Sequence, residues 1–140
     1  MPISPAEQRQ MLRTMQLIRR FEERASRDYL DDKIYGVVHC YIGEEAVAVG
    51  VCSALRQDDQ IISTHRGHGH CIAKGADINR MMAELYGRET GYCKGKGGSM
   101  HLYEKDAGYL GSSSIVGGSV PIATGTALEI KHKKLENVII

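Results

Sequence analysis

The strongest periodic pattern of apolar positions lies near the start of the chain. One set of residues recurs at three- and four-residue spacing, as on one face of an α-helix, while arginines and glutamates fill the opposite face. This set comprises Met11, Met15, Ile18, Glu22, Ala25 and Tyr29, and Leu12 and Phe21 widen it. Ser4, Pro5 and Glu7 form a capping box with proline in the first turn. The pattern predicts a helix over Pro5–Asp31 that packs against a core or a partner.

Shorter apolar runs and turn residues divide the remaining chain into further elements. The predicted elements are a buried extended segment at Gly36–Ile42, a small-residue helix from Gly43 to about Leu55, a strand at Gln60–Thr64, a helix from Asp77 to about Tyr86, a helix at Ser119–Lys134, and a strand that begins at Asn137–Ile140. Residues 88–113 have no periodicity, which predicts a long loop that is functional or disordered. An apolar strand at the last residues indicates either an interrupted domain or a short edge strand.

Composition fits one compact domain of 140 residues, with 42% hydrophobic residues and a net charge of +1. This balanced charge argues against a broad surface for nucleic acid or an anionic membrane. No run reaches the length of a transmembrane helix, and the first residues lack the features of a signal peptide. We therefore expect a cytoplasmic chain that binds neither nucleic acid nor membrane. The four cysteines form no metal-binding or disulfide pattern and are expected to be reduced and mostly buried.

A glycine- and lysine-rich segment, Lys94–His101, is unsuited to an ordinary core element. Glycines let the backbone approach a ligand, and successive free N–H groups form concavities that bind anions. The segment is therefore either an anion-binding loop or a solvated surface loop whose lysines keep it soluble. It matches neither the dinucleotide fingerprint nor a P-loop.

Histidines and one arginine cluster where the strand at Gln60–Thr64 ends. His65, His68 and His70 could suggest a zinc site with the adjacent cysteine, but their spacing matches no common zinc pattern and no carboxylate is adjacent. No metal ligands are assigned. The three histidines and Arg66 are better explained as donors to an anionic ligand. His39 lies in an apolar stretch, where a lone histidine is more often a hydrogen-bonded core residue.

Four segments together resemble one family, the alpha subunits of thiamine-diphosphate-dependent 2-oxo acid dehydrogenases, with the pyruvate and acetoin enzymes as the most similar members. The segments are His39–Ala46, His65–Gly69, Lys94–His101 and Ser114–Pro121, in that order along the chain. The resemblance runs from about Met11 to Ile140. It implies an α/β class, with a three-layer α/β/α fold around a mainly parallel sheet, of which residues 1–140 would be the N-terminal part of a single thiamine-diphosphate-binding domain.

The resemblance also implies site residues. His65 and Arg66 match the pair that contacts the cofactor diphosphate, although most relatives carry tyrosine at the first position. Ser114 and Val116 match the backbone contacts to the aminopyrimidine ring, and the Val116 side chain also holds the cofactor bent. At the position of Ser114 the pyruvate enzymes usually have glycine, whereas the branched-chain enzymes have serine. His39 matches a histidine that faces the 2-oxo acid, which turns it from a core residue into a candidate catalytic residue.

The family function implies partners and a second cofactor. Such a subunit pairs with a beta subunit in a heterotetramer, decarboxylates a 2-oxo acid oxidatively, and passes the acyl group to a lipoyl-bearing acyltransferase. Pyruvate or acetoin is expected rather than a branched-chain acid. The Mg²⁺ ligands and a later histidine loop are expected beyond Ile140, so these residues would be a fragment that is inactive alone. The alternative is a truncated, non-catalytic relative that acts as a subunit-interaction protein.

Overall fold

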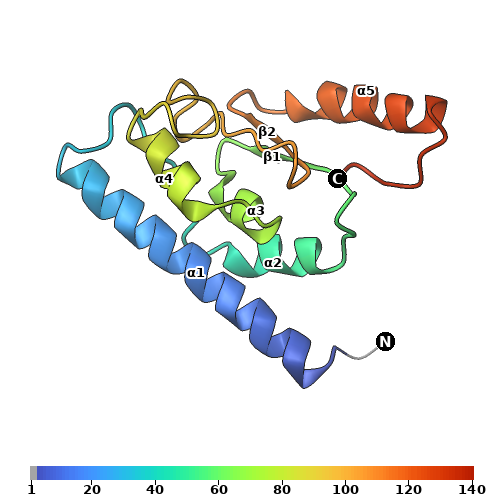
Figure 1. Ribbon diagram of the computed structural model, residues 1–140, viewed down its shortest axis with the longest axis horizontal. Helices are drawn as coiled ribbons and strands as arrows, with labels where there is room; N and C mark the ends of the chain where they lie inside the picture. Colours follow the sequence, from blue (N-terminus) through green and yellow to red (C-terminus); the bar gives the residue numbers. More distant parts are fainter. Residues whose placement is uncertain (1–2) are drawn as a thin grey trace.

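The computed structural model describes residues 3–140 and contains helices around a small parallel sheet (Figure 1). The elements are α1 (Pro5–Leu30), α2 (Glu45–Ser53), β1 (Ile61–Thr64), α3 (His68–Ala73), α4 (Ile78–Leu85), β2 (Tyr109–Ser113) and α5 (Ser119–His132). The predicted helices at the start, middle and end of the chain are confirmed, with ends that differ by one or two residues. Helix α3 and strand β2 were not predicted.

Helix α1 forms for the local reasons that its sequence indicates. The Ser4 N–H donates to the Glu7 carboxylate at 2.7 Å, and the Glu7 N–H donates to Ser4 Oγ at 3.3 Å, so the capping box is present. The buried face consists of Ile18, Phe21, Glu22, Ala25 and Asp28. Leu12 and Tyr29, which were expected on that face, are exposed instead. No helix in residues 3–140 is long and apolar enough to cross a membrane.

The sheet consists of β1 and β2 in parallel, with Thr64 opposite Ser113. The last residues extend it on the other side of β1, where Ile139 forms a parallel bridge with Gln60 and the Ile62 N–H donates to the Ile140 carbonyl at 2.9 Å. Where the start of a buried strand was predicted, the last residues form a single β-bridge beside β1. They are not buried, because Val138 and Ile140 are about half exposed.

Helices lie on both sides of these strands. Figure 1 shows α5 on one side and the bundle of α1, α2, α3 and α4 on the other, with the C-terminus beside β1. Helix α5 contacts β1, whereas α1 contacts α2, α3 and α4. The order helix, sheet, helix confirms the α/β class, with a sheet of few strands. The core lies on the α1 side, around Ile18, Tyr41, Met81 and Tyr109.

The segment before α2 differs from its prediction. Residues 36–42 form no strand, and only Tyr41 among them is buried, while Val37 and Ile42 are exposed. Tyr41 reaches the core because α3 packs tightly against its ring. A Cβ added to Gly69 in α3 would lie 2.2 Å from Tyr41 Cδ1. Close approach, rather than a left-handed backbone, is therefore what requires glycine at this position.

We expect Gly69→Ala to lower the free energy of unfolding by about 1–3 kcal/mol, because the added methyl overpacks the Tyr41 contact. Gly125→Ala is the matched control, since this helical glycine of α5 has no atom within 4 Å of an added Cβ. There the substitution is expected to raise the free energy of unfolding by about 0.5–1 kcal/mol. Urea denaturation measures both values, and equal effects would contradict the packing described here.

Candidate functional site

The carboxyl ends of β1 and β2 meet at one edge of the sheet. Because the strands are parallel and Thr64 pairs with Ser113, the residues that follow each strand leave the sheet at the same edge. His65 and Arg66 follow β1, and the turn that contains Ser114 and Val116 follows β2. The structure thus brings two predicted pairs of site residues, which are distant in sequence, to one edge. Ser114 and Val116 are exposed there, and the Val116 side chain is fully accessible to solvent.

His39 joins this edge from the segment before α2. Its ring lies edge-on to the His65 ring, with centroids 4.9 Å apart and an interplanar angle of 87°. Arg66 is fixed to the same segment, because its Nη1 donates to the Cys40 carbonyl at 2.6 Å. Within residues 3–140, this is the only hydrogen bond of the guanidinium, and no carboxylate pairs with it. A half-buried cation without an anionic partner suits an anionic ligand.

The surroundings of His39 favour a neutral imidazole. Burial lowers the pKa of His39 below its ordinary value, and the nearby His65, Arg66 and His68 lower the pKa further. A neutral ring has one N–H donor and one acceptor nitrogen, so it can both donate a hydrogen bond and take up a proton. His39 is half-buried, which leaves part of the ring accessible at the candidate site.

Two of the three histidines after β1, the buried His68 and the half-buried His70, are hydrogen-bonded to other side chains of the protein, so their prediction as anion donors is wrong. His68 is fully buried, and its Nδ1 lies 3.0 Å from a carboxylate oxygen of Glu22 in α1. The Nδ1 of His70 lies 2.8 Å from Ser63 Oγ, and its Nε2 lies 3.3 Å from the Tyr41 hydroxyl. Helix α3 begins at His68 and turns both rings into the protein, which sequence spacing alone did not reveal. Only His65 and Arg66 of this cluster remain at the sheet edge.

The Lys94–His101 segment is an anion cradle, but its anion belongs to the chain. Glu84 of α4 is fully buried and accepts four backbone N–H groups from this region. The Cys93 and Gly95 N–H groups donate to Oε2 at 2.8 and 2.9 Å, and those of Gly97 and Gly98 donate to Oε1 at 2.7 and 3.2 Å. Gly95 and Gly98 have φ values of 74° and 59°, which glycine adopts without strain. The segment is neither disordered nor a merely solvated loop.

Ser99 connects this loop to His39. Its hydroxyl oxygen accepts the His39 backbone N–H at 3.0 Å and lies 3.0 Å from His68 Nε2. The serine, histidine and Glu22 are arranged as in a hydrolase triad, but all three are buried and the serine oxygen is already hydrogen-bonded to His39. The arrangement is therefore a structural link. Sequence reasoning did not identify Ser99, Glu22 or Glu84 as important for the site. The one signal in the sequence was that Glu22, a charged residue, falls on the apolar face of α1.

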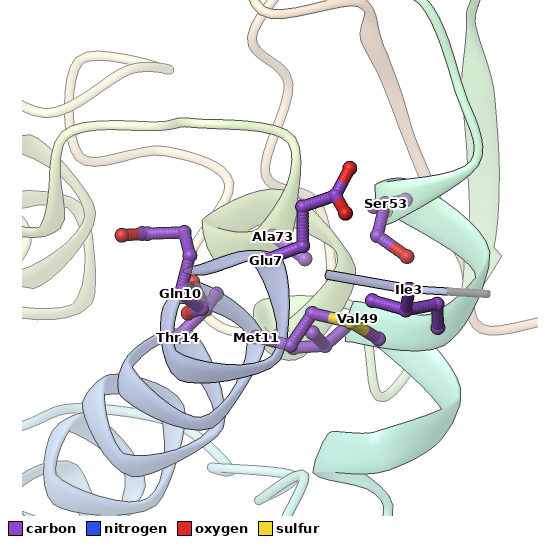
Figure 2. A pocket seen from close by; sticks show the side chains of 9 residues that line it. Ile3, Glu7, Gln10, Met11, Thr14, Val49, Ser53 and Ala73 are labelled. Carbon is purple, nitrogen blue, oxygen red and sulfur yellow. Dashed lines mark hydrogen bonds between the residues drawn. The ribbon is translucent and has the colours of Figure 1, made fainter. Parts of the chain in front are cut away.

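A separate pocket lies away from the sheet edge, where the first turns of α1 face α2 and α3 (Figure 2). Its volume is about 320 Å³, and Met11, Val49 and Ala73 form part of its wall. Its one carboxylate, Glu7, already belongs to the capping box. The lining contains no lysine, arginine or histidine and none of the predicted site residues.

The cysteines and the other potential metal ligands are the remaining reactive groups of residues 3–140. Within residues 3–140, no group of three or more His, Cys, Asp or Glu side chains could hold a metal ion. The four cysteines are free; Cys52 and Cys71 are buried, and the other two are half-buried. Burial raises the pKa of Cys40 and of Cys52 to about 11, so these thiols are uncharged near neutral pH.

Comparison with known proteins agrees with the predicted resemblance. A family model described as "Dehydrogenase E1 component" matches residues 13–140. The chain belongs to this family. The matched range contains every predicted site residue as well as Glu84 and Ser99, and it begins within two residues of the start expected from the sequence. The identification made from the four sequence segments is confirmed.

Curated relatives of this chain include alpha subunits of an acetoin oxidoreductase and of a pyruvate dehydrogenase. The alpha subunit of the acetoin:2,6-dichlorophenolindophenol oxidoreductase of Bacillus subtilis is 54% identical over 91% of this chain and 38% of its own length. The corresponding subunit of Cupriavidus necator is 50% identical over 86% of the chain and 36% of its own length. The alpha subunit of the pyruvate dehydrogenase E1 component of Rhizobium meliloti is 47% identical over 90% of the chain and 36% of its own length. The chain spans about a third of the length of these relatives.

The environment of His39 leads to a pH prediction. His39 should titrate below 6.5, and His65→Gln should raise its pKa because one of the neighbouring titratable rings is removed. His132→Gln, on the exposed end of α5, is the control and should leave the pKa of His39 unchanged. Carbon-13 NMR of labelled histidine rings measures the titration. A His39 pKa at or above 6.5 would contradict the geometry of the site.

Proposed function

We propose that this chain is the N-terminal part of a single thiamine-diphosphate-binding domain, in the alpha subunit of a pyruvate, other 2-oxo acid or acetoin dehydrogenase. Family membership supports the proposal, as do the relatives named for pyruvate and acetoin. The single observation that carries it is the parallel register of β1 and β2. Through this register His65 and Arg66 share one edge with Ser114 and Val116, and His39 lies against His65.

The residues at this edge suit thiamine diphosphate. A diphosphate is strongly anionic, and the Arg66 guanidinium is a half-buried cation with no carboxylate partner in residues 3–140. The Val116 side chain, fully exposed at this edge, would offer the cofactor rings an apolar surface. The site therefore combines charge for the diphosphate with an apolar surface for the rings.

In this proposal the cofactor, when bound, supplies the carbanion and the electron sink that 2-oxo acid decarboxylation requires. The residues of this chain bind the cofactor and orient the substrate. Arg66 and His65 would hold the diphosphate, the backbones of Ser114 and Val116 would contact the aminopyrimidine ring, and the Val116 side chain would support the cofactor. His39 faces the 2-oxo acid, where its neutral ring donates a hydrogen bond to the substrate or takes up a proton at the free nitrogen.

The proposal includes components from outside this chain. Magnesium offsets the diphosphate charge and requires oxygen ligands. We assign those ligands to residues that follow Ile140 in the complete subunit. A beta subunit forms the other wall of the site, and a lipoyl-bearing acyltransferase receives the acyl group. Pyruvate is the favoured substrate among the 2-oxo acids, with acetoin as the alternative.

A second candidate is a non-catalytic subunit-interaction protein. The observation in its favour is that α5 has no buried residue, while Val120, Ile122 and Leu128 are more than half exposed. Several exposed apolar side chains on one helix are typical of a surface that binds another protein. This candidate predicts assembly with a beta-like partner without cofactor binding, which separates it from the dehydrogenase proposal.

In the assembled enzyme, we expect Arg66→Ala to raise the Kd for thiamine diphosphate about 10- to 100-fold, because charge-assisted hydrogen bonds to the diphosphate are lost. Arg27→Ala, which removes an exposed arginine of α1, is the matched control and should leave the Kd unchanged. His39→Ala should instead lower kcat with little effect on that Kd. Calorimetry and steady-state kinetics measure these quantities. If Arg66→Ala and His39→Ala changed cofactor affinity equally, the assigned roles would be wrong.

A further inference from the structure

Glu84 is a buried carboxylate whose charge is offset by backbone alone. It is fully buried in α4, and within residues 3–140 no lysine, arginine or histidine pairs with it. Four N–H groups of the loop from Cys93 to Gly98 converge on its two oxygens. Such a group is costly to bury unless every lone pair that faces the protein is satisfied. The arrangement is therefore specific for a carboxylate at this position.

A neutral amide could not replace this carboxylate. Each oxygen of Glu84 receives two N–H groups, so a glutamine would direct its own NH₂ donor at two backbone donors. The loop is also packed closely against neighbouring backbone, so it cannot relieve the donor–donor contact by a small shift. A Cβ on Gly95 would lie 2.3 Å from the Gly87 carbonyl carbon, and a Cβ on Gly97 would lie 2.5 Å from the His101 oxygen. Loss of the carboxylate should thus displace the loop instead of being absorbed by a small shift.

The loop continues directly from this carboxylate to the candidate site. Gly98 donates to Glu84, and the next residue, Ser99, accepts the His39 backbone N–H at 3.0 Å. Ser99 is also held from the opposite side, because its carbonyl and hydroxyl oxygens lie 3.1 and 3.0 Å from Nε2 of the buried His68. The position of the His39 backbone thus depends on two buried groups, of which Glu84 is the one that shapes the loop.

We propose that Glu84 is a positioning residue: its carboxylate shapes the loop at residues 93–98 and, through Ser99, fixes His39 in the candidate site. The role of His39 in catalysis rests on the proposed function, whereas the coupling between Glu84 and His39 does not. The titratable or charged groups that face His39 are His65 and Arg66 after β1 and His68 of α3. None of them hydrogen-bonds to Glu84 within residues 3–140, so the loop is the hydrogen-bonded connection between Glu84 and His39.

The test is a double-mutant cycle on the full chain, with the His39 titration as its readout and no substrate or cofactor present. Glu84→Gln should raise the pKa of His39 towards its ordinary value of 6.5, because a displaced loop admits water to the imidazole. Ser99→Ala should raise it as well, and the double variant should add little to either single change. Glu129→Gln, which removes an exposed carboxylate of α5, is the control and should change nothing.

A chemical rescue distinguishes positioning from simple loss of packing. In Glu84→Ala, acetate should occupy the vacated cradle and restore the low His39 pKa, whereas chloride at equal ionic strength should not. An unchanged His39 titration in a folded Glu84→Gln chain would overturn the proposal. If that variant does not fold, Ser99→Ala decides, since this variant keeps the Glu84 cradle; an unchanged His39 pKa there would also overturn it. Coupling without any dehydrogenase activity in the assembled enzyme would instead refute the proposed function and leave this inference standing.

Discussion

Four backbone N–H groups of one glycine-rich loop converge on the buried carboxylate of Glu84, and the position of the candidate site depends on this contact. The contact gives the loop one defined shape, so that Ser99 reaches both the His39 backbone and the His68 ring. A second buried carboxylate, Glu22, fixes the other side of that ring. Two acidic residues from different helices thus hold a loop with no regular secondary structure.

The parallel sheet supplies the other half of the site. Strands β1 and β2 are short, but their register determines which residues leave the sheet together. His65 and Arg66 therefore share an edge with Ser114 and Val116 although 48 or more positions separate them in sequence. The Arg66 bond to the Cys40 carbonyl then attaches the His39 segment to the same edge. Local contacts fix the conformation of each segment, and the pairing of β1 with β2 brings the segments together.

Sequence reasoning succeeded where the determinants are local. The capping box and apolar stripe were enough to predict α1, and Asp77 marked the start of α4. Sequence reasoning failed where contacts with residues distant in sequence determine the structure. Strand β2 has no periodic pattern and exists because β1 pairs with it. The sequence of α3 is polar, and its two histidines turn inward only because Glu22, Ser63 and Tyr41, from other parts of the chain, hydrogen-bond to them.

In the candidate site, too, only part of the arrangement could be predicted from the sequence. The residues at the sheet edge were predicted from the family resemblance, but the anion that fills the glycine-rich loop was not, because Glu84 lies on a different element. A pattern of glycines and lysines indicates a cradle for negative charge and does not reveal that the chain supplies the charge itself. The lysines that suggested an external ligand, Lys94 and Lys96, are exposed.

Hydrogen exchange of the assembled enzyme, with and without thiamine diphosphate and magnesium, tests the central claim most directly. If the edge formed by β1 and β2 is the cofactor site, the cofactor should slow exchange in residues 64–67 and 113–118 of this chain. Residues lining the pocket between α1, α2 and α3 should not change. Slowed exchange at that pocket, with both edge segments unaffected, would contradict the account.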